Sequence, residues 1–530
     1  MNREKIHRGI FVAGLVLLIA GLPFSEFFLS ISQIILAGNW LIEGRFREKW
    51  NKLRVNRLAW IFLSLYFIHV IGLLWTTDFS YALKDLRVKA PIFILTLILS
   101  TSEAPCRKVF RGLLAFFTVA VFFSTLYSYL VYQGLTGKEI IDIRDISVFI
   151  SNIRLSLMVC LSVAALYYFF MFDELFKPHL KKILLLLPAL WFLWFLVVLE
   201  SVTGISILLI LSLFIVFNLF RNIQSPWLRS IPAVLLTGLV IVSFFYIKKQ
   251  IADFYIQRET DEKMPALYTK GGEMYEHKLE NKEKENGYFV YRYMAWKELE
   301  RAWKRSSNIP FDSLDNNNQG IRYTLLRFMT SKGLRKDSVG FLSLSHDEIH
   351  EIENGTANIL YMKKSDLKAR IHSLIWEYDN YIQYGNPSGH SATMRIEFWK
   401  NGWQIFKNNL IIGVGTGDIN QAYKNQYEIS KSKLQPRWRL KTHNEYLTMA
   451  ILFGIPGLLL FLLVLFYPLY TKKHFLYVPF FLILIISMLT EDTLETSTGV
   501  TFYAFFSVFL TLSAKNDILS LSEKKHHEKN

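Results

Sequence analysis

The sequence predicts an all-α protein that crosses a membrane about twelve times and carries one large polar loop between the ninth and tenth helices. Three observations lead to this fold class. Hydrophobic residues make up 52% of the 530 residues, and charged residues only 20%. Apolar stretches of about 17–24 residues, each long enough to cross a bilayer as a helix, recur along most of the chain. Basic residues gather in alternate loops, which is typical of a protein with several membrane spans.

The spans are predicted from apolar runs that contain few charges. The first run follows a basic N-terminal segment, Met1 to Arg8, that could begin a signal peptide. No small-residue cleavage site follows it, so we expect an uncleaved first helix. The predicted spans cover residues 9–23, 25–42, 58–75, 90–101, 110–133, 153–172, 183–199, 202–220, 230–247, 443–467, 475–490 and 498–514.

The charges of the loops predict the orientation of the chain. With a cytoplasmic N-terminus, the cytoplasmic segments carry about 23 Lys and Arg residues and the short external loops only about six. The last external loop contains Glu491, Asp492 and Glu495 but no basic residue. Both termini are therefore expected in the cytoplasm. The net charge of +16 is then largely an orientation signal, and no nucleic-acid partner is expected.

The long polar segment before the tenth span is large enough to hold a core of its own. A helix is expected in it where Trp296, Leu299 and Trp303 share one face. The chain is thus divided into helices one to nine, the external loop, helices ten to twelve and a cytoplasmic tail, in residues 1–247, 248–441, 442–514 and 515–530.

Cofactor chemistry has no support in the sequence. No motif for a nucleotide, a dinucleotide or a catalytic metal is present. The two cysteines, Cys106 and Cys160, cannot form a disulfide framework, and no Cys/His cluster suggests a metal site. We therefore expect no cofactor and no metal.

Polar residues that could carry chemistry concentrate between residues 394 and 457. Arg395 opens a helical run in which Trp399 and Trp403 lie on the same face. The aromatic residues could stack on sugars, and packing within the protein is the alternative.

A glycine-rich segment, Gly413-Val-Gly-Thr-Gly-Asp418, follows this run. Its glycines could let backbone N–H groups approach a ligand and form an anion-binding concavity. Gly415, Gly417 and Asp418 are therefore candidate substrate-binding residues. A plain turn after an amphipathic helix is the competing interpretation.

The segment Thr442-His-Asn-Glu445 stands directly before the tenth span. Thr442 and Glu445 have the spacing of a capping box, which predicts that the helix starts there, with His443 in its first turn. A helix N-terminus favours an anion such as a phosphate. It also disfavours a charged imidazole, so we expect a neutral His443 that can accept a proton, with Asn444 contacting the substrate. The alternative is a histidine that anchors a helix end at the interface.

Two further candidates lie at the external ends of other spans. Arg154 begins the sixth span, where an arginine can anchor the helix at the interface or bind a phosphate. Glu491 in the last external loop is a candidate substrate-binding residue, and a solvated turn is the alternative.

Taken together, these residues resemble the O-antigen ligase and polymerase superfamily, bacterial enzymes that act on glycans linked to undecaprenyl diphosphate. Close similarity covers only the part of the chain around these motifs. The layout of the spans, with a large external loop before the histidine motif, extends the resemblance to the whole chain. The resemblance rests on Arg395, Trp399 and Trp403, on Gly413-Val-Gly-Thr-Gly417, on His443-Asn-Glu-Tyr-Leu447, on Phe453-Gly-Ile-Pro-Gly457 and on the segment from Glu491 to Tyr503.

The resemblance implies a GT-C-like membrane fold whose large loop is periplasmic. It implies a metal-independent glycosyltransferase at the periplasmic face of the bacterial inner membrane, with Arg395 binding the lipid diphosphate and His443 as the catalytic residue. The implied partners are an undecaprenyl-diphosphate-linked glycan donor, an acceptor hydroxyl on lipid A–core or on another glycan or protein, and membrane lipids.

The chain departs from the family pattern in two places. Family members commonly carry a Ser-Arg pair at the external start of the span that corresponds to 202–220, where this chain has Ser201-Val202. Arg154 could supply the missing charge. The portion from Gln257 to Ser391 is longer than the usual family loop, and its role is unassigned.

Ligase is the favoured function within the superfamily, because the histidine and glycine patterns are those that ligases most often show. A polysaccharide polymerase or a protein O-oligosaccharyltransferase shares the same motifs. A polysaccharide transporter or flippase without chemistry is the alternative from another class. The polar residues argue against it, because they gather at the external interface rather than at the middle of the spans.

Overall fold

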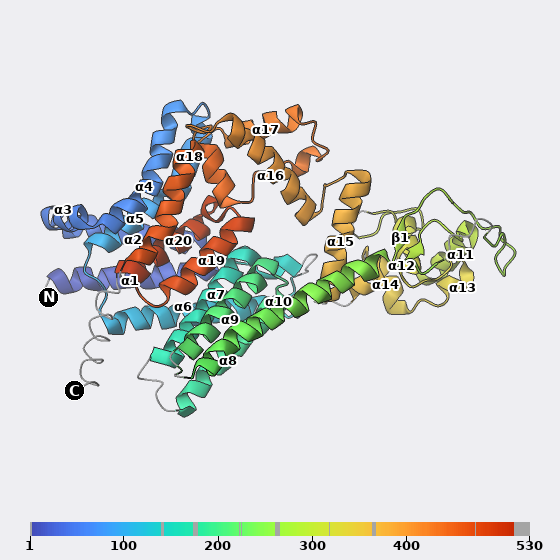
Figure 1. Ribbon diagram of the computed structural model, residues 1–530, viewed down its shortest axis with the longest axis horizontal. Coiled ribbons are helices and arrows are strands. Elements are labelled where there is room, and N and C mark those ends of the chain that lie inside the picture. The colour runs from blue at the N-terminus through green and yellow to red at the C-terminus, as the bar shows by residue number, and fades with distance from the viewer. Residues whose placement is uncertain are drawn as a thin grey trace. The chain divides into compact units, whose positions relative to one another are not determined.

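The computed structural model describes residues 3–138, 143–172, 179–221, 223, 225–259, 265–316, 319–362, 367–471 and 473–512. The predicted cytoplasmic tail, 515–530, lies outside these residues. The chain forms two compact units, one of residues 1–232 with 386–530 and one of residues 233–385. Figure 1 shows that helices dominate both units.

The first unit contains the larger hydrophobic core. Its helices are α1 (Arg3–Phe24), α2 (Glu26–Glu43), α3 (Phe46–Val55), α4 (Arg57–Ile71), α5 (Phe79–Thr101), α6 (Arg107–Tyr132), α7 (Asn152–Phe172), α8 (His179–Val198), α9 (Val202–Arg221), α16 (Ser391–Asn408), α17 (Ile419–Ile429), α18 (Glu445–Phe466), α19 (Tyr477–Thr490) and α20 (Ser497–Leu512). Short 3-10 helices are η1 (Gly72–Trp75), η2 (Ile143–Ile146), η5 (Pro436–Trp438), η6 (Tyr467–Tyr470) and η7 (Thr493–Glu495).

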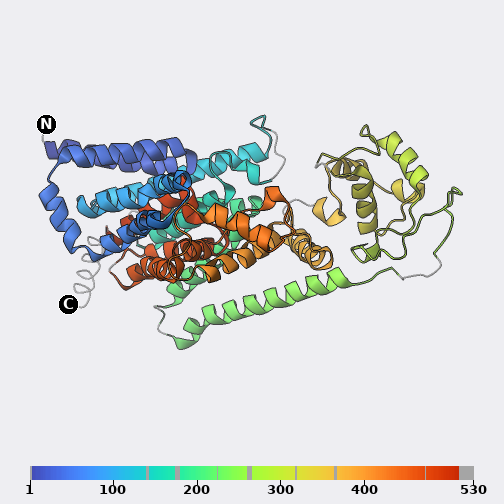
Figure 2. The same ribbon diagram turned by 90° about the horizontal axis from the view of Figure 1, so that it is seen from above.

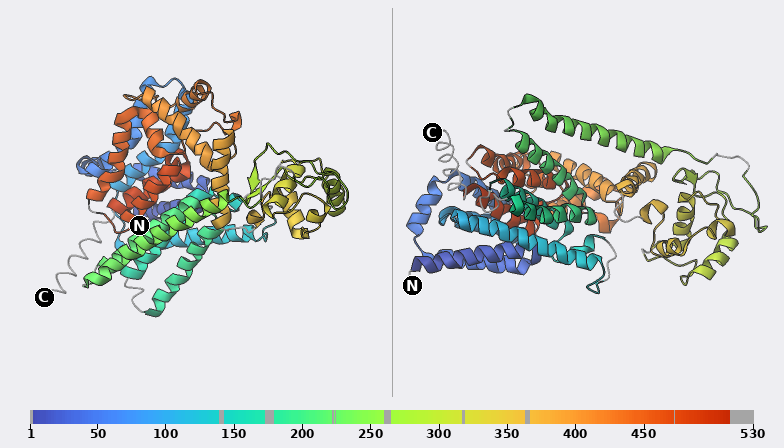
Figure 3. Two further views of the ribbon diagram at one scale, coloured as in Figure 1. Left: turned by 45° about the vertical axis from the view of Figure 1, so that its right-hand side comes forward. Right: turned by 90° about the horizontal axis from the view of Figure 1, so that it is seen from below.

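Helices from the two ends of the sequence pack together in this unit. The N-terminal helices α1 and α2 lie side by side, as Figure 2 shows from above. The C-terminal helix α20 packs against α5, and α18 packs against α4 (Figure 3, red and blue). Segments that are hundreds of residues apart in the sequence therefore share one helical bundle.

The second unit has its own core, which includes the buried side chains of Trp303, Phe328 and Phe341. The helix predicted from Trp296, Leu299 and Trp303 is confirmed as α11. The elements of this unit are α10 (Pro226–Tyr255), most of which belongs to it, β1 (Lys284–Glu285), β2 (Tyr288–Phe289), α11 (Trp296–Ser306), α12 (Ile321–Ser331), α13 (Ser338–Phe341), α14 (His346–Glu353), η4 (Ile359–Met362) and α15 (Leu367–Tyr384). The two strands pair antiparallel.

Seven of the described helices are long and apolar enough to cross a membrane, namely α1, α4 with η1, α6, α7, α9, α10 and α18. The number is eight if α2 and α3, which are bent by 113° at their junction, form one broken span. The chain is therefore a multi-pass helical membrane protein. Each of the twelve predicted spans falls on a helix, but the count of twelve is not confirmed, partly because α19 and α20 are short.

The helix that contains the fourth predicted span begins earlier than the hydrophobic pattern indicates. Helix α5 starts at Phe79 rather than at residue 90, and the carboxylate of Asp78 caps it by accepting the N–H of Tyr81 at 2.9 Å. The charged residue Lys89 stands directly before the predicted span. It is nevertheless buried within the helix, where carboxylates neutralise it.

Helix α18 is broken in its middle. Gly454 has a φ of 66°, and Pro456 has no N–H to donate. The N–H of Ile455 leaves the helix and donates to the carbonyl of Leu410 at 2.8 Å. Two carbonyls just before the break therefore lack their usual helical donors.

The glycine-rich loop supplies these missing donors. The N–H of Val414 donates to the carbonyl of Ile451 at 2.9 Å, and that of Gly415 donates to the carbonyl of Leu452 at 3.0 Å. Gly413 is the residue at which the loop comes closest to α18. It has a φ of 70°, and a Cβ there would stand 2.3 Å from the backbone of Leu452. Only glycine fits this position without strain.

Candidate active site

A cavity of about 740 Å³ lies in the first unit, beside the N-terminal end of α18. Volumes of this size are typical of sites for small molecules. The lining comes from α7, α17, the segment before α18 and the loop between α19 and α20. Its ionisable side chains include Arg154, Lys441, His443, Glu491, Asp492 and Glu495.

His443 lies just outside α18 and not in its first turn, so the predicted helix start is wrong. The helix begins at Glu445, and Asn444 is its N-cap, whose side chain accepts the N–H of Leu447 at 2.9 Å. His443 has a φ of 46°, in the left-handed region. Asn444 thus has a capping role, and its contact with a substrate stays a prediction.

The predicted capping box does not form, because both of its members have distant partners. The hydroxyl of Thr442 donates to Asp492 at 3.0 Å. The carboxylate of Glu445 accepts the N–H of Leu494 at 2.8 Å. The spacing that suggests a capping box is common, and here tertiary contacts outweigh it.

Asp492 holds the histidine segment in place. Its buried carboxylate accepts the backbone N–H groups of His443 at 3.0 Å and Asn444 at 3.1 Å, and the hydroxyl of Thr448 at 2.8 Å. The anion at this helix N-terminus is therefore a side chain of the protein itself, and these two N–H groups are occupied. The expectation that the helix end keeps His443 neutral stays a prediction.

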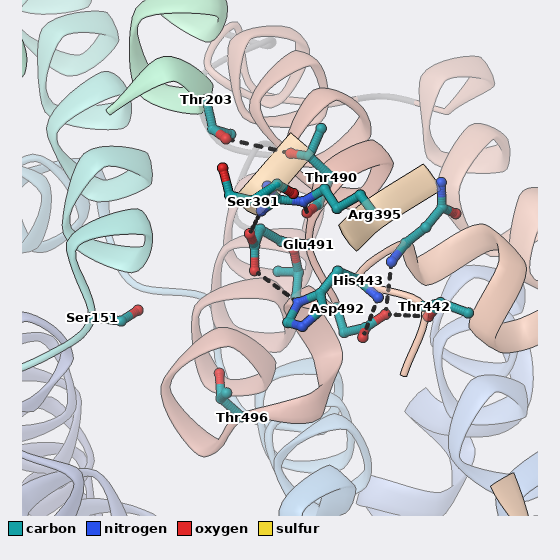
Figure 4. Close-up of polar contacts among 12 residues, drawn as sticks. Ser151, Thr203, Ser391, Arg395, Thr442, His443, Thr490, Glu491, Asp492 and Thr496 are labelled. Atoms are coloured by element: carbon teal, nitrogen blue, oxygen red, sulfur yellow. Dashed lines mark hydrogen bonds and ion pairs between the residues drawn. The ribbon is translucent and has the colours of Figure 1, made fainter. Parts of the chain in front are cut away.

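Glu491 joins Arg395 to His443, and Figure 4 shows the three side chains turned toward one another. One carboxylate oxygen accepts from Arg395 Nη2 at 2.7 Å, and the other lies 3.7 Å from His443 Nδ1. Glu491 is only 6% exposed, which excludes the solvated turn. Burial would raise the pKa of Glu491, but His443, Arg395 and Arg154 outweigh burial and hold that pKa below its usual value.

Arg395 lies in α16 and is held by three acceptors. Besides Glu491, these are the carbonyls of Thr490, 3.3 Å from Nε, and Ser391, 3.4 Å from Nη1. A guanidinium has five N–H groups, and these contacts use three of them. Arg395 is not among the residues that line the cavity. The neighbouring Trp399 donates its indole N–H to the carbonyl of Thr442 at 2.9 Å, which ties α16 to the histidine segment.

Arg154 lies in the first turn of α7 and lines the same cavity as His443. Its Nη2 donates to the carbonyl of Asp492 at 3.1 Å, and its Nε donates to the hydroxyl of Thr496 at 3.3 Å. The residue is 7% exposed. Both acceptors are uncharged, and the nearby carboxylates of Glu491, Glu445 and Asp492 act on the guanidinium through space.

The glycine-rich loop lies apart from the lining of the cavity. The N–H of Gly417 donates to Thr76 Oγ1 at 3.2 Å, and the carboxylate of Asp418 accepts the N–H groups of Thr77 and Asp78, each at 2.8 Å. Gly415, Gly417 and Asp418 thus pack against the segment that precedes α5. Substrate binding by Gly415, Gly417 and Asp418 stays a prediction, and these contacts give it no support.

The sequence did not identify Asp492 or Lys441 as site residues. An acidic pair in an otherwise apolar C-terminal region was the visible signal for Asp492. Lys441 carried no local signal, because its carboxylate partner, Glu495, lies in a different loop.

Residues 342–462 match a family model described as O-antigen ligase. No curated protein matches the chain. The matched residues include Arg395, the glycine-rich loop and His443, whereas Arg154 and Glu491 lie outside them. For the segment that carries Arg395 and His443, the comparison therefore confirms the resemblance to the O-antigen ligase superfamily.

Proposed function

We propose that the protein is an O-antigen ligase-type glycosyltransferase. It moves a glycan from undecaprenyl diphosphate to an acceptor hydroxyl on lipid A–core, at the periplasmic face of the bacterial inner membrane. The observation that supports this best is the cavity that His443 and Arg154 share, next to the segment that matches O-antigen ligase. A base and a cluster of positive charge are the two groups that this transfer requires.

His443 acts as the base in this proposal. Its Nδ1 faces Glu491, which leaves Nε2 to take the proton of the acceptor hydroxyl. The hydroxyl oxygen forms a bond to the anomeric carbon while the bond from that carbon to the diphosphate oxygen breaks. The diphosphate leaves with the electron pair, and the ionised Glu491 stabilises the imidazolium that holds the proton.

The leaving diphosphate needs charge neutralisation rather than protonation. Arg154 provides a buried positive charge whose direct acceptors are neutral. Helix α7 packs against α9, and Ser156 in α7 contacts Gly204 near the start of α9. Arg154 is thus close to the helix end where the superfamily commonly carries its Ser-Arg pair. Arg395 would add positive charge to the same diphosphate through the two N–H groups that its contacts within the protein do not use.

Replacing Arg154 tests this charge directly. We expect Arg154→Ala to raise the KM for the lipid-linked donor by roughly tenfold or more, because a charged hydrogen bond to phosphate is lost. Arg154→Lys should retain part of the affinity, and Arg437→Ala, at an exposed arginine outside the cavity lining, serves as the control. Normal donor affinity in Arg154→Ala would remove Arg154 from the site.

A polymerase or a protein O-oligosaccharyltransferase would use the same residues with a different acceptor. The lipopolysaccharide of a strain that lacks the protein separates the first two functions. Loss of a ligase leaves bare core, whereas loss of a polymerase leaves core with a single repeat. We expect bare core.

A further inference from the structure

Glu495 in η7 binds two lysines at once. One carboxylate oxygen accepts from Lys89 Nζ at 2.9 Å, and the other accepts from Lys441 Nζ at 2.6 Å. The hydroxyl of Tyr81 accepts from Lys441 at 2.7 Å and donates to Glu495 at 3.3 Å. The carboxylate therefore has two lysine partners and one hydroxyl partner.

The two lysines differ in their access to the cavity. Lys89 is fully buried in α5 and also pairs with Asp85 of the same helix. Lys441 lines the cavity, its side chain is 25% exposed, and it stands two residues before His443. Of the pair, Lys441 is the one that a ligand in the cavity can reach.

Glu495 keeps other partners when Lys441 leaves it. Breaking a buried ion pair is usually expensive, because the remaining charge is left alone. Here Glu495 would keep Lys89, which it shares with Asp85, and the hydroxyl of Tyr81, while Lys441 would gain an anionic phosphate oxygen. An ammonium group on a flexible four-carbon chain can also follow a phosphate oxygen over a short distance.

Lys441 is charged before any ligand arrives. Burial alone would lower the pKa of Lys441, but Glu495 and Tyr81 raise it above its ordinary value. Lys441 therefore brings a full positive charge to the cavity without taking up a proton.

We propose that Lys441 is an exchangeable cation that pairs with Glu495 in the free protein and moves to a diphosphate oxygen of the donor when it binds. The inference rests on the proposed function and adds a second positive charge to that of Arg154. A diphosphate carries more than one negative charge and gains another as it leaves, so a single arginine does not neutralise it. The position of Lys441 also places this charge beside His443.

Inhibition of the purified full-length protein by undecaprenyl diphosphate, compared with undecaprenyl monophosphate, tests the proposal. Lys441→Gln should weaken inhibition by the diphosphate about tenfold, since a charge-assisted contact is lost, and should weaken inhibition by the monophosphate much less. Lys441→Arg should restore part of the difference. Lys424→Gln is the matched control, because Lys424 is an exposed lysine of the same cavity.

The proposal would be overturned if Lys441→Gln were inhibited by the diphosphate as strongly as the wild type, or if it lost the same factor in inhibition by the diphosphate and the monophosphate. It would also be overturned if Lys424→Gln weakened inhibition by the diphosphate as much as Lys441→Gln does. Lys441→Met removes the same charge if the glutamine variant does not fold. The proposed function fails separately, if the wild-type protein transfers no glycan. Undecaprenyl diphosphate should then still raise the Tm of the wild type more than that of Lys441→Gln, and equal shifts would contradict the role of Lys441.

Discussion

Glu491 is the residue that links Arg395 to the imidazole of His443. It is buried, it is ionised, and it contacts both Arg395 and His443. An ionised carboxylate in this position orients the imidazole and stabilises the charge that develops when the imidazole takes a proton. Glu491 is thus a positioning residue in the proposed reaction, and Arg395 in turn holds Glu491.

Glu491→Gln keeps the shape of the side chain and removes its charge. We expect kcat to fall by roughly tenfold or more, because the imidazolium loses its stabilising partner. The KM for the donor should change little, since the arginines proposed to bind the diphosphate are retained. Steady-state kinetics of the purified variant measure both, and an unchanged kcat would remove Glu491 from the mechanism.

Stability should also depend on Glu491 in a pH-dependent way. Its pKa in the folded protein lies below the ordinary value of 4.5. The charge therefore stabilises the fold above that pH, and the contribution is lost as the pH falls below 4.5 through the lower folded pKa. The Tm difference between wild type and Glu491→Gln should be full at pH 7 and shrink below pH 4.5. A difference that does not change with pH would contradict this assignment.

At the scale of elements, the break in α18 accounts for the position of the glycine-rich loop against that helix. The break exposes two carbonyls, and the loop satisfies both with its N–H groups. Broken membrane helices require such partners, because lipid offers none. The loop and α18 therefore form one structural joint. This joint holds α18, the helix that begins two residues after His443.

Gly413→Ala tests this joint. We expect a loss of roughly 2–4 kcal/mol in stability, because the new Cβ meets the backbone of Leu452 and the φ is positive. Gly112→Ala in α6 is the control, since a Cβ there meets no atom within 4 Å. It should leave the Tm unchanged or raise it slightly. Thermal unfolding in detergent compares the two, and equal stability would argue against the joint.

The positions of helices could be predicted from the sequence better than their ends or their polar contacts. Apolar runs predict helices because burial depends on local composition, and every predicted span falls on a helix. The capping box at Thr442 failed because Asp492 and the N–H of Leu494, both in another loop, bind the side chains of Thr442 and Glu445. Glu491 could be placed in a loop, but its burial depends on Arg395, a partner that no local pattern reveals.

At the scale of the whole molecule, the proposed orientation depends on the positions of basic residues. It places both termini in the cytoplasm and the polar segment 248–441 in the periplasm. The second unit, with its own core, contains much of that segment. The proposed reaction requires this side, because the lipid-linked donor is expected at the periplasmic face.

Cysteine labelling tests the orientation. In a background without the native Cys106 and Cys160, Glu280→Cys in the second unit should react with a membrane-impermeant thiol reagent in intact spheroplasts. Lys52→Cys in α3 should react only after lysis, since the basic loop is expected in the cytoplasm. The reverse pattern would invert the topology and remove the cavity from the periplasmic face.

The proposed function depends on chemistry at His443. The most direct measurement is glycan transfer by purified wild-type protein and by His443→Ala, with a lipid-linked glycan as donor and lipid A–core as acceptor. We predict transfer by the wild type and a loss of at least about a hundredfold in the variant, which should still insert and fold. Transfer by His443→Ala at the rate of the wild type would contradict the account.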